Sequence, residues 1–278
     1  MRTPSEIFEL ILNIAENDNR IRAVILTGSR ANKACPADKY QDFDIVFFVK
    51  DVTPFWDNMK WIDEVFGKPS LVQKPESMTL IPPDNNGDYV YLMIFPDGNR
   101  IDLQITAHKY ENNGEPAKVL LDKDNTFKEI VVREDYWYVK RPDKKLFSDC
   151  CNEFYWCLSN VAKGIARDEL SYAMKMYNHY VRDMLITMLE WYVGANHDFK
   201  VSAGKNGKYF KRFLPKDIYE SFKRTYSDAD SEHMWEAAFE MLNLFGRAAR
   251  DIAGKLSFSY DEEEECGIRL YMKMVRER

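Results

Sequence analysis

The spacing of apolar residues changes once along this chain of 278 residues, near residue 145. Before that point, short apolar runs carry the alternation that is typical of strands. After it, apolar residues recur every three to four positions, as in amphipathic helices. A chain of this length accommodates two domains. The pattern therefore predicts an α+β architecture, with a mixed-sheet domain over residues 1–145 and an all-α helical bundle over residues 146–278.

Individual elements follow from the same pattern. A helix is predicted over 4–18, and strands are predicted over 21–26 and 42–49. A hairpin is predicted over 89–95 and 100–106, because the intervening Pro96-Asp97-Gly98-Asn99 supplies the dihedral angles of a tight turn. Later helices are expected from Asp149 and around 174–192, 235–249 and 268–275, whereas the acidic run 261–265 is interpreted as a solvated turn.

Two acids, Asp42 and Asp44, open the second predicted strand. Because side chains alternate along a strand, both carboxylates project from one face. Two close carboxylates repel each other unless a cation lies between them, and Mg²⁺ is the usual one. Gly28 and Ser29, followed by Arg30, come directly after the first strand. There, a glycine lets the backbone approach a phosphate, and a serine hydroxyl can donate to it. The sequence thus predicts a metal–nucleotide site.

A third acid, Asp102, lies on the predicted hairpin, on the face opposite Ile101 and Leu103. Three strand-borne acids can hold one or two magnesium ions and orient a hydroxyl for attack on a phosphoryl centre. Asp102 is then either the third metal ligand or the base that takes the hydroxyl proton. Both roles need only an ionised acid near the metal, so the sequence leaves the two open.

The helical half offers candidate contacts for a cationic substrate. Glu153, Trp156 and Asn160 lie opposite the apolar stripe of the helix from Asp149. A tryptophan on that face either packs against another domain or lines a ligand pocket, where a guanidinium can stack on the ring and bond to a carboxylate. Asp183 and Glu190 share one face of the next helix, and a merely solvated face is the alternative for them.

The composition of residues 202–209 predicts a loop. The segment contains two glycines and two lysines, Lys205 and Lys208. A loop that binds a triphosphate needs such residues, but the spacing differs from a Walker motif, so an exposed turn is the alternative.

The motifs Gly28-Ser29, Asp42-x-Asp44 and Asp102 resemble those of the nucleotidyltransferase superfamily. The segments 152–156, 161–164, 202–205 and 225–226 are similar to those of the aminoglycoside 6-adenylyltransferases, and the resemblance covers nearly the whole chain. It implies a mixed-sheet nucleotidyltransferase domain, a helical C-terminal domain, ATP with Mg²⁺, and transfer of AMP to the 6-hydroxyl of streptomycin. It also implies that Lys205 contacts the triphosphate, and it leaves Lys208 open.

Composition narrows the choice of partner and compartment. The net charge of −6 disfavours nucleic acid and favours a cationic partner such as an aminoglycoside. The chain has no apolar stretch of the roughly 20 residues that span a bilayer. Its acidic start does not match a signal peptide. We therefore expect a cytoplasmic monomer without membrane contact.

Two other functions are compatible with the fold. The first is a nucleotidyltransferase that acts on a protein or RNA acceptor, which the negative charge disfavours. The second is a non-catalytic nucleotide-binding regulator. Such a protein has usually lost one of the metal-binding acids, whereas this sequence keeps all three, Asp42, Asp44 and Asp102.

Overall fold

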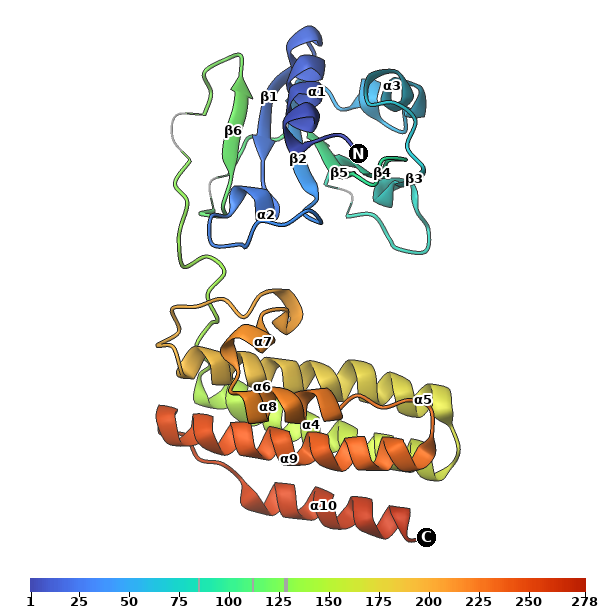
Figure 1. The fold of residues 1–278 in the computed structure, drawn as a ribbon, viewed down its shortest axis with the longest axis vertical. Coiled ribbons are helices and arrows are strands. Elements are labelled where there is room, and N and C mark those ends of the chain that lie inside the picture. Colours follow the sequence, from blue (N-terminus) through green and yellow to red (C-terminus); the bar gives the residue numbers. More distant parts are fainter. Residues whose placement is uncertain (85, 112, 128–129) are drawn as a thin grey trace. The chain divides into compact units, whose positions relative to one another are not determined.

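The computed structural model describes residues 1–84, 86–111, 113–127 and 130–278 (Figure 1). The chain divides into two compact units, Met1–Tyr136 and Trp137–Arg278. This division lies ahead of residue 145, where the sequence predicts the boundary. The segment before the first long helix packs with the helical unit, since the backbone N–H of Val139 donates to the carbonyl of Val201.

The first unit contains the predicted mixed sheet, which has six strands. Its strands are β1 (Ile21–Leu26), β2 (Phe43–Val49), β3 (Leu71–Gln73), β4 (Tyr89–Ile94), β5 (Arg100–Thr106) and β6 (Lys118–Asp122). They lie in the order β3-β4-β5-β2-β1-β6. β2 and β5 pair in parallel, and the other neighbouring pairs are antiparallel. The predicted hairpin is confirmed as β4 and β5.

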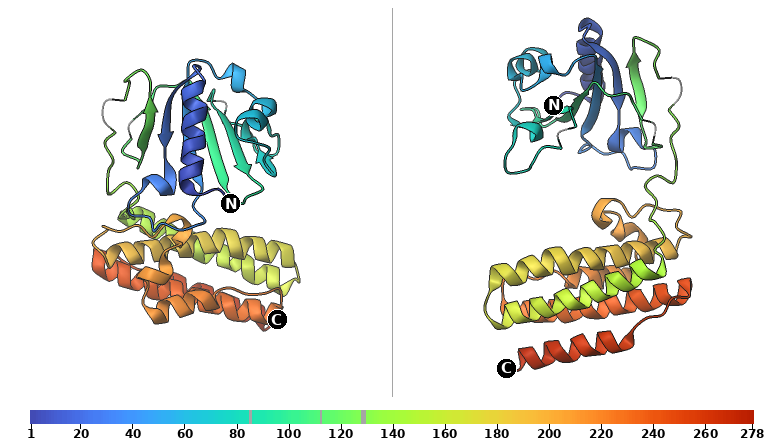
Figure 2. Two further views of the ribbon diagram at one scale, coloured as in Figure 1. Left: turned by 45° about the horizontal axis from the view of Figure 1, so that its top comes forward. Right: turned by 180° about the vertical axis from the view of Figure 1, so that it is seen from behind.

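Helices cover one face of this sheet and leave part of the other open. Figure 2 shows α1 (Pro4–Asn17) lying across the sheet. Trp61 and Ile62 of α3 (Met59–Val65) are buried in the same apolar cluster as α1. Ile7 and Ile11 of α1 are buried in one apolar cluster with Phe43 and Phe47 of β2. Alternate residues of β2, beginning with Asp44, are only half-buried. The sheet therefore has an apolar face under the helices and a polar face that can carry a site.

Shorter elements complete the first unit. They are α2 (Gly28–Ala31) and two 3₁₀ turns, Thr53–Phe55 and Pro75–Ser77. α1 begins with a capping box, in which Thr3 accepts from the backbone of Glu6 and the Glu6 carboxylate accepts from the backbone of Thr3. This reciprocal pairing explains why the predicted first helix starts where it does.

The second unit is all α-helical. Its helices are α4 (Lys144–Ala166), α5 (Leu170–Lys175), α6 (Arg182–Ala195), α7 (Phe210–Phe213), α8 (Lys216–Arg224), α9 (Ser231–Leu256) and α10 (Glu262–Arg276). Phe154 of α4 stacks on Phe245 of α9, with ring centroids 3.7 Å apart, at the centre of the bundle. A 3₁₀ turn, Lys205–Gly207, lies between α6 and α7. The predicted helical bundle is confirmed.

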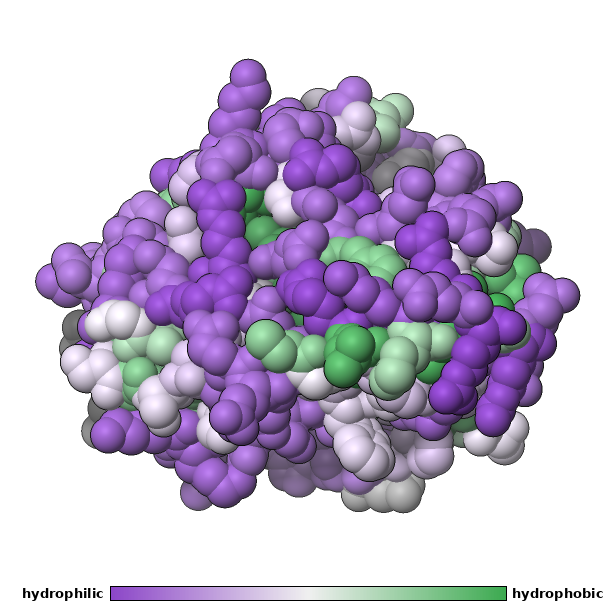
Figure 3. Space-filling view, turned by 90° about the horizontal axis from the view of Figure 1, so that it is seen from below, coloured by the Kyte–Doolittle hydropathy of each residue, from purple (hydrophilic) through white to green (hydrophobic). Residues whose placement is uncertain are grey.

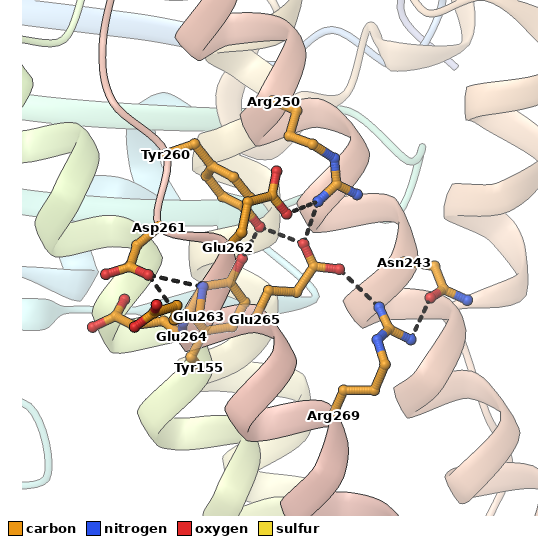
Figure 4. Close-up of polar contacts among 10 residues, drawn as sticks. All are labelled: Tyr155, Asn243, Arg250, Tyr260, Asp261, Glu262, Glu263, Glu264, Glu265 and Arg269. Carbon is orange, nitrogen blue, oxygen red and sulfur yellow. Dashed lines mark hydrogen bonds and ion pairs between the residues drawn. The ribbon is translucent and has the colours of Figure 1, made fainter.

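One local prediction for this unit is refined by the structure, and one is wrong. The helix expected over 174–192 is interrupted by a π-helical turn, Met176–Val181, which separates α5 from α6. The acidic run 261–265 is not a solvated turn. Asp261 accepts from the backbone N–H groups of Glu263 and Glu264 and caps α10, whose first turn is formed by the acids that follow (Figure 4). Acidic side chains are favourable there because the helix N-terminus carries partial positive charge.

The side chains at the surface are mainly hydrophilic, as expected when the apolar residues lie in the two cores. Most of the surface visible in Figure 3 is hydrophilic, with a short row of hydrophobic side chains across it. Within the described ranges, no helix combines the length and the apolar character needed to cross a membrane.

Candidate active site

The three predicted acids meet on the open face of the sheet. The parallel register pairs Asp44 of β2 directly with Asp102 of β5. Asp42 precedes β2 by one residue, and Arg100 links it to Asp102. The hairpin turn and the register between distant strands therefore bring together residues that lie 60 positions apart in the sequence.

Arg100 is the only basic side chain that pairs with these acids among the described ion pairs. Its Nε and Nη2 donate to Asp102 Oδ1 and Oδ2 over 2.8 Å and 2.6 Å. Its Nη1 lies 3.5 Å from Asp42 Oδ2. The sequence prediction missed Arg100. The available signal was its position two residues before Asp102, which places both side chains on the same face of β5.

One arginine does not neutralise three carboxylates. Burial, together with the charges of Asp102 and Asp42, raises the pKa of Asp44 to about 6. Burial also raises the pKa of Asp42, although Arg100 opposes the shift. These shifts mean that the cluster holds more negative charge than its surroundings stabilise. Such a cluster favours the binding of an additional cation.

The donor set fits Mg²⁺, which binds carboxylate oxygens. In the part of the chain that the structure describes, no group of three or more His, Cys, Asp or Glu side chains is arranged so that it could hold a metal ion as it stands. Arg100 instead bridges Asp102 and Asp42. The chemistry of the residues is therefore suitable for a hard cation, whereas the geometry seen here is that of an arginine-bridged cluster.

A glycine is required beside the cluster. Gly28 has a φ of +65°, and a Cβ added there would lie 2.0 Å from Asp44 Oδ2. The backbone N–H of Thr27 also donates to the carbonyl of Asp44 over 2.9 Å. The turn that carries Ser29 is thus pressed against β2, and any side chain at position 28 would displace the Asp44 carboxylate.

Ser29 and Arg30 have partners in the same region. The Gln41 side chain donates to the carbonyl and hydroxyl oxygens of Ser29 over 3.3 Å and 3.4 Å. Arg30 donates to the carbonyl of Asp42 over 2.9 Å, and its guanidinium lies 3.9 Å from the centre of the Phe43 ring. Arg30 therefore holds the backbone that presents Asp42.

In the second unit, the structure brings Glu190 to the predicted lysine loop. The Glu190 carboxylate accepts from the backbone N–H of Gly207, and burial raises its pKa. Lys205 and Lys208 flank that glycine, and both side chains are exposed. Glu190 thus helps to fix the backbone of the turn that carries Lys205 and Lys208.

The other predicted residues of this unit are more exposed. Asp183 lies 3.3 Å from His179, and both side chains are 53% exposed. On α4, Trp156 is 70% exposed and Asn160 is half-buried. Glu153 lies beside Cys157, with 3.2 Å between its Oε1 and the sulfur. The side chains on α4 remain available to a ligand or to another surface.

Three carboxylates on the open face of a mixed sheet, beside a glycine–serine turn, form the arrangement expected of a nucleotidyltransferase. The chain belongs to the streptomycin adenylyltransferase family, whose sequence model matches residues 1–275. The resemblance drawn from the motifs is therefore confirmed.

Individual relatives are also similar to this chain over almost its whole length. The chain is 38% identical to an aminoglycoside 6-adenylyltransferase of Bacillus subtilis, covering 99% of this chain and 98% of that protein. It is 37% identical to one from Campylobacter jejuni, over 95% and 93% of the two chains. A crystal structure of an aminoglycoside 6-adenyltransferase from Bacillus subtilis has 35% identity and a TM-score of 0.48, with 99% of both chains covered. The family match and the sequence identities to the curated relatives show that the protein is an aminoglycoside nucleotidyltransferase, with ATP as the co-substrate that the family implies.

Proposed function

We propose that this enzyme transfers AMP from ATP to the 6-hydroxyl of streptomycin in a Mg²⁺-dependent reaction and releases pyrophosphate. The observation that carries the proposal is the under-neutralised cluster of Asp42, Asp44 and Asp102 against the Gly28 turn. The family description supports streptomycin as the acceptor. The net charge of −6 is consistent with a cationic acceptor.

The sheet residues serve the chemical step. Asp42 and Asp44 hold the metal, which when bound neutralises charge on the phosphoryl oxygens. Asp102 is the third ligand or the base that takes the proton from the acceptor hydroxyl. Each of its oxygens accepts one hydrogen bond from Arg100 and keeps a second lone pair, so either role is chemically available.

The remaining residues bind the two substrates. Gly28 and Ser29 approach the phosphates, with Arg30 positioning the neighbouring backbone, and Lys205 and Lys208 contact the triphosphate. Streptomycin is bound by residues of the helical unit, namely Glu153, Trp156, Asn160, Asp183 and Glu190. The cytoplasmic location and monomeric state expected from the sequence stay predictions.

Incubation of the enzyme with labelled ATP, Mg²⁺ and an aminoglycoside tests the function. We expect one pyrophosphate for each AMP transferred to streptomycin, and little turnover with kanamycin-type aminoglycosides, which lack the guanidinium-bearing ring. Equal activity on both classes would contradict the acceptor assignment. Release of phosphate without pyrophosphate would identify a kinase instead. Omission of Mg²⁺ with a chelator present should abolish transfer, and full activity under those conditions would contradict the metal assignment.

A further inference from the structure

A cavity of about 610 Å³ lies within the first unit, on the sheet face that carries the acids. It is lined by Val46 and Phe48, which follow Asp44 at alternate positions of β2, and by Gln104 and Thr106, which follow Asp102 on β5. Its volume is in the range of about 300–1,000 Å³ that is usual for ligand pockets. The cavity therefore continues the proposed catalytic face along the same two strands.

The feature that singles out this cavity is the carboxylate of Asp88, which precedes β4 and lines the cavity. Asp88 is only 6% exposed. Its Oδ2 accepts from Gln104 over 2.7 Å and from Asn86 over 3.4 Å. Its Oδ1 is buried and has no hydrogen-bond partner among the described residues.

His108 is the basic side chain nearest to that oxygen among the described ion pairs. Its Nε2 lies 3.7 Å from Asp88 Oδ1, beyond hydrogen-bonding distance, and 2.5 Å from the carbonyl of Asn86. A buried carboxylate oxygen without a donor is unfavourable, because burial removes its water. A ligand that donates a hydrogen bond to Asp88 Oδ1 would remove this deficit.

The rest of the lining indicates which ligand fits. Glu111 and Glu115 add two carboxylates, against Lys109 as the one lysine or arginine of the lining. Phe48 and Tyr110 supply aromatic surface, with ring centroids 6.2 Å apart. Carboxylates beside aromatic rings are the surroundings that guanidinium and ammonium groups prefer. The amine of an adenine can donate to Asp88, but it would leave the buried charge uncompensated.

We propose that this cavity binds a guanidinium or ammonium group of the aminoglycoside acceptor, with Asp88 as its carboxylate partner. The inference rests on the proposed function for the identity of the acceptor. It adds a binding site in the first unit, apart from the contacts assigned to the helical unit, and it places the cationic group on the same sheet face as Asp44 and Asp102.

The test is titration calorimetry with two separate probes, the bis-guanidino cyclitol of streptomycin and adenosine. Asp88→Asn keeps the shape of the side chain and removes its charge. We expect its affinity for the cyclitol to fall about tenfold or more, since hydrogen bonds to a charged group are lost. Adenosine affinity should change less than about twofold. Asp63→Asn is the matched control, because this exposed acid of α3 lies outside the cavity lining, and its cyclitol affinity should equal that of the wild type.

A second variant keeps the test decisive if Asp88→Asn does not fold. Tyr110→Leu removes one aromatic wall and should weaken cyclitol binding by about threefold, the size of a modest cation–π contribution. Wild-type cyclitol affinity in folded variants overturns the proposal. A selective loss of adenosine binding also overturns it and indicates a nucleoside site.

Failure of this inference is distinguishable from failure of the proposed function. If the wild type transfers AMP to streptomycin but does not bind the cyclitol, the cavity assignment is wrong and the function stands. If the cyclitol binds through Asp88 but streptomycin is not adenylylated, the cavity assignment stands and the proposed acceptor is wrong.

Discussion

Two carboxylate clusters of this protein differ in how far neighbouring arginines offset their negative charge. On the sheet, three acids share Arg100. In the helical unit, a single buried acid, Glu265, receives several donors (Figure 4), namely Tyr260, Arg250 and Arg269. A glycine makes room for the carboxylate in both cases. An added Cβ would lie 2.0 Å from Asp44 at Gly28 and 2.5 Å from Glu265 at Gly246.

The pKa shifts of the two clusters differ in direction. Burial and the neighbouring acids raise the pKa of Asp44 to about 6. Burial would also raise the pKa of Glu265, but hydrogen bonds from Tyr260, Arg269 and Arg250 outweigh it and lower the pKa. A carboxylate that receives a full set of hydrogen-bond donors, such as Glu265, contributes to stability. A carboxylate whose charge is only partly offset, such as Asp44, can still bind a cation. The comparison therefore distinguishes the cluster whose charge the protein itself offsets from the proposed catalytic cluster.

The largest expected effect is on catalysis at the sheet cluster. Asp44→Asn should lower AMP transfer about a thousandfold or more, because the amide preserves shape but forfeits the charge that binds the metal. The melting temperature in metal-free buffer should not fall, since the substitution removes one of three repelling charges. Steady-state kinetics and circular dichroism measure the two quantities.

The matched control for this variant is Asp63→Asn, an exposed acid of α3. It should retain wild-type activity. Near-normal turnover of Asp44→Asn at ordinary Mg²⁺ levels would contradict the functional assignment. A large loss of stability would instead show that the sheet cluster is structural, like the one around Glu265.

The second effect is on stability at the helical cluster. Glu265→Gln removes the charge that Arg250 and Arg269 share and should lower the free energy of unfolding by about 2 kcal/mol, as for hydrogen bonds to a charged group. Glu263→Gln, on the same turn of α10 but exposed, is the control and should be neutral. Thermal melts of both variants at pH 7 give the comparison. Equal melting temperatures would mean that the Glu265 network adds nothing to stability.

A smaller effect is the pH dependence of the difference in melting temperature between the wild type and Glu265→Gln. Because the folded pKa of Glu265 is lowered below its ordinary value of 4.5, the unfolded chain takes up the proton first as the pH falls. The stabilisation is fully present above that value and is lost as the pH falls through the folded pKa. The gap in melting temperature between wild type and Glu265→Gln should therefore keep its pH 7 size until the pH approaches 4.5 and narrow below that value. A gap that widens would reverse the sign of the shift.

The sequence predicts the elements of the sheet better than their pairing. Pro96 and Gly98 mark the hairpin, and alternation marks β2, because both signals are local. The parallel register that sets Asp44 opposite Asp102 joins strands distant in the sequence, so no local pattern contains it. The edge strands β3 and β6 are short and at most half-buried, which leaves little alternation to detect.

Burial explains the misses at individual residues. Glu265 lies within an acidic run that is solvated elsewhere, and only the packing of α10 buries it. Asp88 has no partner acid at strand spacing, and its buried oxygen becomes evident only when β4 and β5 are paired. Arg100 shares its face with Asp102, a signal that is present in the sequence but common on exposed strands.

The smallest expected effect concerns a carboxylate that belongs to neither cluster. Asp183 on α6 is half-exposed and pairs with His179, so solvent screens its charge. If it contacts streptomycin, Asp183→Asn should raise the KM for streptomycin by about threefold and leave kcat unchanged, because a screened contact made equally to substrate and transition state alters only affinity. Glu236→Gln, an exposed acid of α9, is the control. An unchanged KM for Asp183→Asn, measured beside this control, would leave Asp183 as a solvated partner of His179 and restrict the cation-binding acids to buried positions such as Asp88.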